Sequence, residues 1–424
     1  MPRLLGSRSL AWFLPCYAVV LLLAAPQLSF WLDEVLTLTG ASQPDLPSLM
    51  ENLRKQQGAT PLAFLIPHWT IQLFGFSQLT ARLPSILASI AACPALFLIA
   101  RNIGLQVPIF PVVVFALWPL QFRYALEARP YALALCLGLW LTRAFLTKSH
   151  WSIYLLLTIA MGFTHPYALV IPAVHLLWSF LHDRPRAILP AAALALACLT
   201  LLPWYAHFSA DWRAQSTEQQ LALANPRAIL VFLRELSGSG YIGTAILFAG
   251  VALGLRRPLE PKRFWIAWAV LPLVAVPLAN IAFDYFFAIR QLIYILPALT
   301  LLFCAASGRA GKTLLCGFLA ASAYANIAWF QRPREDWSAA SNAIATEVAR
   351  GSCVQFVGDA QKLFVFFHPE LSSHLCAADA PRVVLAGSSY EPTQAAARAA
   401  LLTRGLSKQS ARTYVAPTIE VYGR

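Results

Sequence analysis

Residues 28–40 of the chain read LSFWLDEVLTLTG, and they follow directly on its first apolar run. Asp33 and Glu34 are therefore two adjacent acids a few residues beyond the expected end of a membrane-spanning helix. They have a simple structural interpretation, because carboxylates cap short helices and favour their positively charged N-terminal ends. The other interpretation is a functional site at the membrane boundary. Which of these two interpretations applies depends on which other residues lie at that boundary.

The composition of the whole chain indicates a polytopic membrane protein. Of its 424 residues, 58% are hydrophobic and only 12% are charged. A soluble protein carries about a quarter charged residues, so the composition excludes an ordinary soluble domain. Apolar runs of about 20 residues, the length that crosses a bilayer, recur through the first three quarters of the chain.

The net charge of +13 comes largely from short basic clusters that separate the apolar runs. Every second loop is basic and holds few acids, which is the pattern of the positive-inside rule. These clusters therefore mark the cytoplasmic face, and the basic charge implies no nucleic-acid partner. They are Arg3 and Arg8; Arg101; Arg143 and Lys148; Arg184 and Arg186; Arg256, Arg257, Lys262 and Arg263; and Arg309 and Lys312.

Placing the basic loops inside predicts an α-helical membrane domain, residues 1–330, with about eleven spans. An odd number of spans puts the N-terminus in the cytoplasm and the C-terminal tail outside. Two long loops, 29–80 and 206–240, then lie on the outer side. The spans are expected near 11–28, 82–100, 107–123, 131–147, 151–166, 168–181, 187–205, 241–255, 264–283, 291–307 and 313–330.

The tail, residues 331–424, has the pattern of a small α/β domain on the outer side. The segment REDWSAASNAIATEVA is typical of an amphipathic helix, and CVQFVG, RVVLAG and TIEVYG are short β-branched runs that end at glycine. Cys353 and Cys376 lie in this tail, where an outer location would permit a disulfide between them. The other six cysteines lie in apolar runs without metal-ligand spacing.

Unusual polar residues also occur where the expected spans meet on the outer side. QFRYALEARPY places Glu127, Arg129 and Tyr131 at the junction of the third and fourth spans. FTHPYAL places His165 at the next outer turn, and FDYFFAIRQ places Arg290 at a later one. Ionisable groups at a membrane boundary cost free energy unless they are paired or used. Their shared position predicts an outward-facing site.

Each of these residues also has an ordinary interpretation. His165 has the position of a hydrogen-bonded turn histidine, and Arg290 that of an arginine whose side chain reaches up to the headgroups. Arg129 differs, because Pro130 biases it away from helical geometry and lets its side chain leave the helix face. The common location of the residues carries more weight than any one of them.

Three segments together resemble the membrane glycosyltransferases of the GT-C fold: FWLDE, GATPLAFLIPHWTIQLFGFSQLTARLPSILASIAA and YALEARPYALAL. More narrowly, they resemble glycosyltransferase family 39, the protein O-mannosyltransferase-like group. This group also takes in lipid A aminoarabinose transferases and rhizobial galacturonosyltransferases. The resemblance is strongest over about residues 28–180, and it continues more loosely through YFFAIRQLIYILPAL and the EDW that opens the tail.

The resemblance implies inverting transfer of a sugar from a polyprenyl-phosphate carrier to an acceptor hydroxyl on the outer face. The acceptor class (lipid A, a glycan, another lipid or protein) is left open. Asp33 matches the catalytic acid of the family's first outer loop. Because phosphate is already a good leaving group, one carboxylate suffices to take the acceptor's proton, whereas glycoside hydrolases need two.

The other candidate residues have supporting roles in this hypothesis. Guanidinium groups stabilise the negative charge that builds on the departing phosphate, which suits Arg129 and Arg290, with Arg82 of ARLPS as a weaker third. Glu34 would position the acceptor or hold an arginine. Glu127, His165 and Tyr131 complete the expected substrate-binding set.

The expected cofactor requirement is none. Glu127 is the one acid near EARPY, so the sequence gives little support to a divalent metal. The resemblance implies a location in the bacterial inner membrane. Two other functions remain open: a transporter or lipid flippase, which tends to show repeated halves and polar helices at the midplane, and a noncatalytic subunit of an envelope-polysaccharide assembly.

Overall fold

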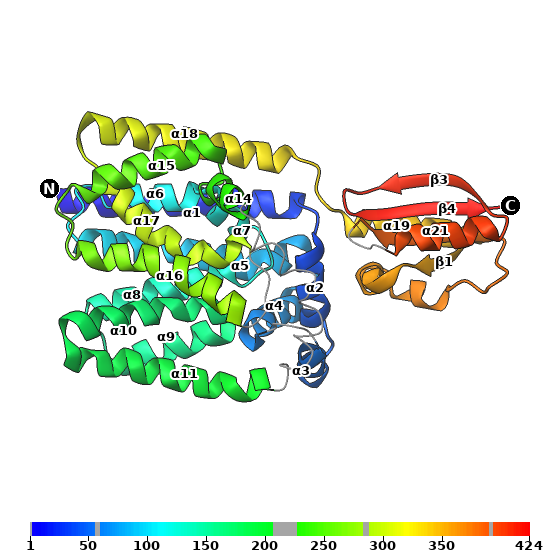
Figure 1. Ribbon diagram of the computed structural model, residues 1–424, viewed down its shortest axis with the longest axis horizontal. Coiled ribbons are helices and arrows are strands. Elements are labelled where there is room, and N and C mark those ends of the chain that lie inside the picture. The colour runs from blue at the N-terminus through cyan, green and yellow to red at the C-terminus, as the bar shows by residue number, and fades with distance from the viewer. Residues whose placement is uncertain (1, 56–59, 207–226, 283–287, 390–392) are drawn as a thin grey trace. The chain divides into compact units, whose positions relative to one another are not determined.

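The computed structural model describes residues 2–55, 60–206, 227–282, 288–389 and 393–424 (Figure 1). Its internal contacts divide the chain into two compact units. The first unit comprises Met1–Ala25 and Ala41–Phe330, and the second comprises Pro26–Gly40 and Gln331–Arg424. Each unit is described by itself below. Most of the expected outer loop 206–240 lies outside the described residues, because 207–226 are not among them.

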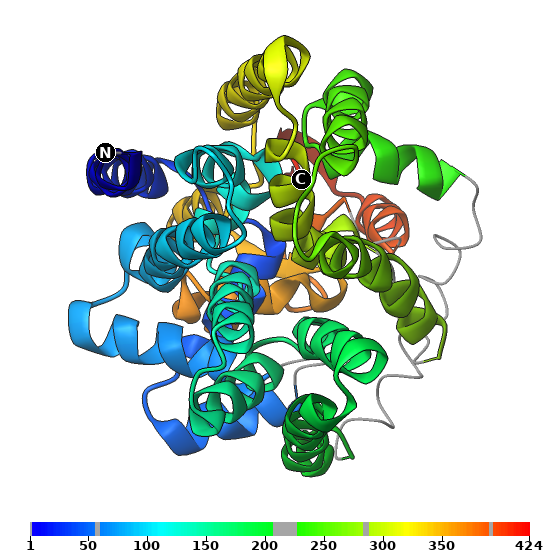
Figure 2. The same ribbon diagram turned by 90° about the vertical axis from the view of Figure 1, so that its left-hand side faces the viewer.

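The first unit is helical, and Figure 2 shows many of its helices nearly end-on. Within the described residues, each expected span coincides with one helix, with a helix and its adjoining turn, or, for 107–123, with two consecutive helices. The α-helices are α1 (Pro2–Ala24), α3 (Leu46–Lys55), α4 (Pro61–Phe74), α5 (Gln78–Asn102), α6 (Ile109–Leu117), α7 (Pro119–Ala125), α8 (Tyr131–Leu146), α9 (Trp151–Thr164), α10 (Val170–His182), α11 (Ile188–Ala206), α14 (Arg227–Leu236), α15 (Gly240–Leu255), α16 (Lys262–Ala282), α17 (Leu296–Cys304) and α18 (Gly308–Gln331). Four 3-10 turns adjoin them: η1 (Ala25–Gln27), η2 (Pro166–Leu169), η3 (Arg184–Ala187) and η4 (Ile289–Ile295).

Several of these helices have the length and composition of membrane spans. Among the described residues, five meet both criteria, and a sixth span results if the bent pair Leu230–Leu236 and Gly240–Leu255 is counted as one. Shorter apolar helices are Tyr131–Leu146, Trp151–Thr164, Pro166–His182 and Ile289–Cys304. The expected total of about eleven spans and the orientation of the two termini remain predictions.

The third expected span, 107–123, is broken into α6 and α7 at Trp118. Pro119 disfavours helical geometry at the residue before it, and Trp118 has an extended ψ of 123°. A break inside an apolar bundle frees backbone groups that need new partners. The side-chain amide of Asn326 in α18 donates to the oxygen of Leu117 at 2.8 Å, and the indole of Trp118 donates to the oxygen of Leu236 at 2.9 Å.

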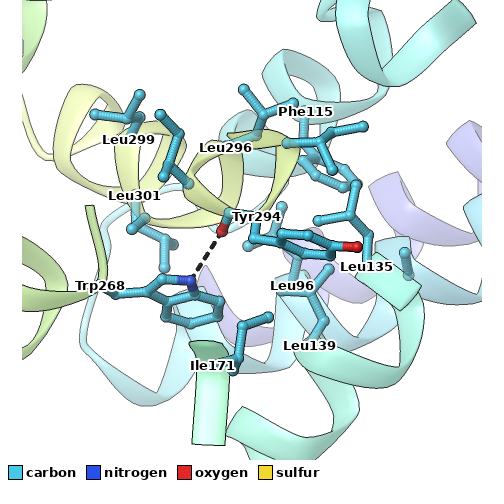
Figure 3. Close-up of a cluster of buried hydrophobic side chains, with 14 of the residues drawn as sticks. Leu96, Phe115, Leu135, Leu139, Ile171, Trp268, Tyr294, Leu296, Leu299 and Leu301 are labelled. Carbon is cyan, nitrogen blue, oxygen red and sulfur yellow. Dashed lines mark hydrogen bonds between the residues drawn. The ribbon is translucent and has the colours of Figure 1, made fainter. Parts of the chain in front are cut away.

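The core of the first unit lies among α5, α6, α8, α10, α16 and α17. Figure 3 shows Tyr294 surrounded by apolar side chains of several of these helices. The indole nitrogen of Trp268 donates to the backbone oxygen of Tyr294 at 2.9 Å, which joins α16 to η4. This bond holds η4, where the chain enters α17, against the core.

The expected outer loop 29–80 is largely helical. In the first unit it forms α3 and α4, and α4 exposes Trp69, Leu73 and Phe74. His68, on the same helix, is buried, and its Nδ1 lies 2.9 Å from the oxygen of Ala41. An exposed apolar face of this kind suits a helix at a membrane surface.

The second unit contains a four-stranded sheet in the order β1-β2-β4-β3. Its strands are β1 (Cys353–Phe356), β2 (Arg382–Ser388), β3 (Ser407–Thr413) and β4 (Pro417–Gly423), and β1 pairs with β2 in parallel while the other pairs are antiparallel. Its remaining helices and turns are α2 (Leu32–Ala41), α19 (Trp337–Ala349), η5 (Gly358–Ala360), α20 (Gln361–Val365), η6 (Pro369–Ser373) and α21 (Gln394–Thr403). A disulfide joins Cys353 to Cys376.

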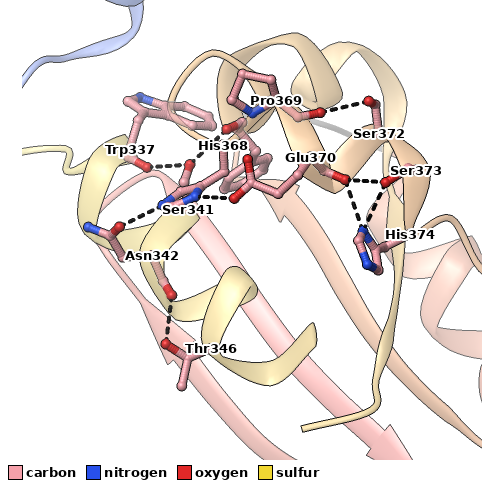
Figure 4. A network of polar contacts seen from close by, with 11 residues as sticks. Trp337, Ser341, Asn342, Thr346, His368, Pro369, Glu370, Ser372, Ser373 and His374 are labelled. Carbon is pink, nitrogen blue, oxygen red and sulfur yellow. Dashed lines mark hydrogen bonds and ion pairs between the residues drawn. The ribbon is translucent and has the colours of Figure 1, made fainter. Parts of the chain in front are cut away.

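A polar network fastens η6 to α19. Figure 4 shows the imidazole of His368 between Asn342 and Glu370, with 2.7 Å to the oxygen on either side. His374 closes the turn, since its Nδ1 lies 2.9 Å from the backbone oxygen of Glu370. This network stabilises the turn that leads to Cys376.

Residues 26–40 belong to the second unit, although the sequence analysis placed them in the domain 1–330. The reason is a set of long-range contacts. Leu28 and Phe30 are buried, and the ring of Phe30 stacks on that of Phe367 with centroids 6.5 Å apart. The segment that carries the Asp-Glu pair is thus structurally part of the tail.

Candidate functional site

A cluster of aromatic rings surrounds His165 in the first unit. His165 lies between α9 and η2, outside both helices. Its ring centroid is 5.1 Å from Tyr131, 5.6 Å from Tyr167 and 6.0 Å from Tyr294. Tyr131 in turn lies 4.6 Å from Tyr124. The junctions of several helices therefore meet at one aromatic cluster, as the sequence predicts for Tyr131 and His165.

Arg129 and Arg290 bring positive charge to this cluster. Arg129 lies in the bend between α7 and α8, outside helical geometry as Pro130 predicts, and its guanidinium carbon is 5.9 Å from the Tyr131 ring centroid. The positive charges of Arg129 and Arg290 both act on the imidazole of His165. Three residues taken from distant parts of the sequence therefore act on one another electrostatically.

The charge of the cluster follows from its residue types. Guanidinium groups stay positively charged in proteins, so Arg129 and Arg290 give the cluster positive charge. The ring nitrogens of His165 add hydrogen-bonding groups beside them. Such a cluster suits an anion such as phosphate.

A chain of side-chain hydrogen bonds fixes the backbone next to Arg290. The hydroxyl of Tyr167 donates to the amide oxygen of Asn280, and the amide nitrogen of Asn280 donates to the Gln291 oxygen at 2.8 Å. That same Gln291 oxygen accepts the backbone N–H of Ala288 at 3.2 Å. Asn280 and Gln291 are both buried, so η2, the end of α16 and the start of η4 are tied together.

Sequence reasoning missed Asn280, Gln291 and Tyr294 as members of this cluster. The two amides carried a usable signal, because a buried amide needs hydrogen-bond partners and is therefore unusual in an apolar segment. Tyr294 carried none, since it stands within the apolar run IYILPAL.

Two other predicted residues are buried away from solvent in the same unit. Arg82 in α5 is fully buried, and its guanidinium donates to the backbone oxygen of Ala25 at 2.7 Å. This contact holds the end of the first helical segment against α5 and favours a structural role for Arg82. Glu127 is 6% exposed and lies in the bend that also carries Arg129. The backbone N–H of Arg129 donates to the backbone oxygen of Glu127 at 2.8 Å.

Asp33 and Glu34 lie in the first turn of α2, in the second unit. Glu34 is fully buried and its carboxylate lies 3.5 Å from the N–H of Trp31, so it reaches back toward the start of its own helix. Asp33 is partly buried. The contact of Glu34 with Trp31 is typical of a helix-capping residue, and the site roles of Asp33 and Glu34 stay predictions.

The described part of the chain contains no group of three or more His, Cys, Asp and Glu side chains able to hold a metal ion. The absence of a metal requirement stays a prediction from the sequence.

Comparisons with known proteins identify the fold. No protein-family model matches the chain, and no curated protein matches it significantly. Two crystal structures of ArnT from Cupriavidus metallidurans match it over almost its whole length. The apo structure is 12% identical and covers 98% of both chains with a TM-score of 0.61. The structure bound to undecaprenyl phosphate is 12% identical and covers 97% of both chains with a TM-score of 0.57. The chain therefore has the fold of a GT-C membrane glycosyltransferase, as predicted.

Proposed function

We propose that this protein is an inverting glycosyltransferase that moves a sugar from a polyprenyl-phosphate carrier to an acceptor hydroxyl on the outer face of the membrane. The observation that carries the proposal is the convergence of the positive charges of Arg129 and Arg290 on the aromatic cluster around His165. It occurs in a fold shared with a protein crystallised with undecaprenyl phosphate. The narrower relation to glycosyltransferase family 39 rests on the sequence segments quoted above.

The two arginines would hold the phosphate of the donor. Guanidinium groups bind phosphate oxygens with paired, charge-assisted hydrogen bonds, and negative charge grows on that phosphate as the bond to the sugar breaks. The arginines therefore stabilise the transition state more than the ground state. His165, Tyr131 and Glu127 would contact the sugar or the acceptor through hydrogen bonds and ring faces.

Asp33 would act as the general base. Its carboxylate takes the proton of the acceptor hydroxyl while the acceptor oxygen forms a bond to the anomeric carbon. The bond between that carbon and the phosphate oxygen breaks with its electron pair, so polyprenyl phosphate leaves and the anomeric centre inverts. Asp33 follows Ala25, the residue whose oxygen binds Arg82, by eight positions along the chain.

The test is sugar transfer by the purified protein in nanodiscs. A panel of radiolabelled polyprenyl-phosphate sugars serves as donor, and an envelope extract supplies the acceptor. The wild type is compared with Asp33→Asn and with the matched control Asp45→Asn. Asp45 is an exposed acid in the same outer segment, its Oδ1 accepts the Ser48 N–H at 2.8 Å, and asparagine can keep that bond.

We expect transfer from one donor, reduced by about a hundredfold or more in Asp33→Asn and unchanged in Asp45→Asn. Full activity of Asp33→Asn would remove Asp33 from the chemistry and direct attention to Glu127. Absence of transfer from every donor, with a folded protein and a validated acceptor extract, would favour a transporter or a noncatalytic subunit.

A further inference from the structure

We propose that Glu335 is a positioning residue that fixes the start of the helix carrying Asp33. The proposal rests on the proposed function, because it assigns Glu335 a part in presenting Asp33 to the acceptor. It also gives the C-terminal unit a role, since Glu335 stands where that unit's long segment begins. All contacts used below lie within the second unit.

Two donors from different segments converge on one oxygen of Glu335. The backbone N–H of Leu32 donates to its Oε2 at 2.9 Å, and the indole N–H of Trp337 donates to the same oxygen at 3.0 Å. A third contact uses the backbone of Glu335, whose oxygen accepts the hydroxyl of Ser29 at 2.7 Å. Glu335 therefore binds residues on both sides of Trp31.

The position of Leu32 explains why a carboxylate is useful here. Leu32 is the first residue of α2, and the first four N–H groups of a helix have no partner within the helix. A carboxylate at this end accepts such a donor and also interacts favourably with the positive end of the helix dipole. Glu335 thus caps α2 from about 300 residues away along the chain, next to Asp33.

Apolar packing makes this anchor rigid. Trp337 is fully buried, and its ring lies edge-to-face with that of Phe364 at 5.2 Å. On the α2 side, Phe30 is 3% exposed and stacks on Phe367. The hydrogen bonds of Glu335 therefore join two segments, and each of these segments is packed against the α/β domain.

A base must be held accurately to work, because a displacement of about 1 Å from the reactive geometry can cost roughly a hundredfold in rate. Loss of the Glu335 anchor should leave donor binding intact, since the phosphate is assigned to the arginines of the first unit. We therefore expect kcat to fall while the KM for the donor stays within about twofold. A purely structural defect that lowers the amount of folded enzyme would not expose residues 28–36 selectively.

The experiment compares Glu335→Ala and Glu335→Gln with the wild type, Asp33→Asn and Asp336→Asn. Glutamine keeps an acceptor oxygen without the charge, so its kcat should lie between those of the wild type and the alanine variant. Asp336→Asn is the matched control, because the neighbouring Asp336 caps a different helix, with its Oδ1 accepting the Ala339 N–H at 2.9 Å. Hydrogen–deuterium exchange of peptides from residues 28–36 is measured in parallel on every variant.

The expected result is a kcat loss of about tenfold or more in Glu335→Ala, with faster exchange in residues 28–36 and neither effect in Asp336→Asn. Unchanged exchange in Glu335→Ala, or an unchanged kcat while Asp33→Asn is inactive, would overturn the positioning role and leave the proposed function standing. If the wild type transfers no sugar, the proposed function fails, and unchanged exchange in Glu335→Ala would overturn the anchor separately.

Discussion

At the residue scale, Arg129 and Arg290 define the part of the molecule that suits a phosphate. Both guanidinium groups act on the imidazole of His165, and both stay positively charged in proteins. An arginine differs from a lysine at such a place, because its planar group can bind two phosphate oxygens at once. This difference gives a test of the assignment.

We predict that Arg290→Lys keeps part of the transfer activity and that Arg290→Gln lowers kcat/KM by about a hundredfold or more. Arg101→Gln is the matched control, because Arg101 is exposed in the last turn of α5 and belongs to the basic clusters assigned to the cytoplasmic face. The measurement is the nanodisc transfer assay. Equal activity of Arg290→Gln and Arg101→Gln would remove Arg290 from the phosphate site.

At the element scale, the bundle depends on close approaches between helices. Gly254 of α15 is one, because a Cβ there would meet the backbone oxygen of Leu302 at 1.8 Å. Backbone at this distance cannot move aside cheaply, whereas a Cβ on Gly317 of α18 would meet its nearest neighbour at an ordinary 3.7 Å.

We predict that Gly254→Ala destabilises the protein by about 1–3 kcal/mol through overpacking. Gly317→Ala should be neutral or slightly stabilising, because alanine favours helix over glycine. Thermal unfolding of both variants in detergent or nanodiscs measures the difference. A melting temperature of Gly254→Ala at or above that of Gly317→Ala would show that α15 and α17 do not pack this closely.

The predictability of the elements followed their hydrophobic pattern. The positions of the long apolar helices could be predicted from their apolar runs, and those of β1, β2 and β4 from short β-branched runs that end at glycine. β3 could not, since SKQSART is polar and exposed at every position. The break at Trp118 was predictable in principle from Pro119. The hydrogen bond that Asn326 donates to the freed backbone oxygen of Leu117 was not predictable, because it joins residues 209 positions apart.

At the scale of the whole molecule, the site could be predicted only in part. Local sequence placed Arg129, Tyr131, His165 and Arg290 at span junctions, and the structure brings these residues into one cluster. The association of residues 26–40 with the tail depends on long-range contacts that no local pattern encodes. Hence Asp33 could be singled out from sequence, whereas the hydrogen bond from the neighbouring Leu32 to Glu335 could not.

The disulfide tests the location of the tail. Cys353 and Cys376 are bonded, and a stable disulfide requires an oxidising compartment such as the periplasm. We predict linked peptides of these two cysteines in a non-reducing digest of the native membrane protein. Cys353→Ser should cost about 2–4 kcal/mol of stability, and Cys316→Ser, at an exposed free thiol, little. Both cysteines found alkylated without prior reduction would contradict an outer location.

In the proposed reaction the carrier gives up its sugar and leaves as polyprenyl phosphate. The most direct measurement is mass spectrometry of the lipid fraction during turnover, with undecaprenyl-phosphate sugar as donor and the product's anomeric configuration determined by NMR. We predict one undecaprenyl phosphate released for each sugar transferred, with the anomeric configuration inverted. Donor lipid that only changes leaflet would contradict this reaction and identify a transporter, and donor lipid that stays intact in its own leaflet would contradict it and favour a noncatalytic subunit.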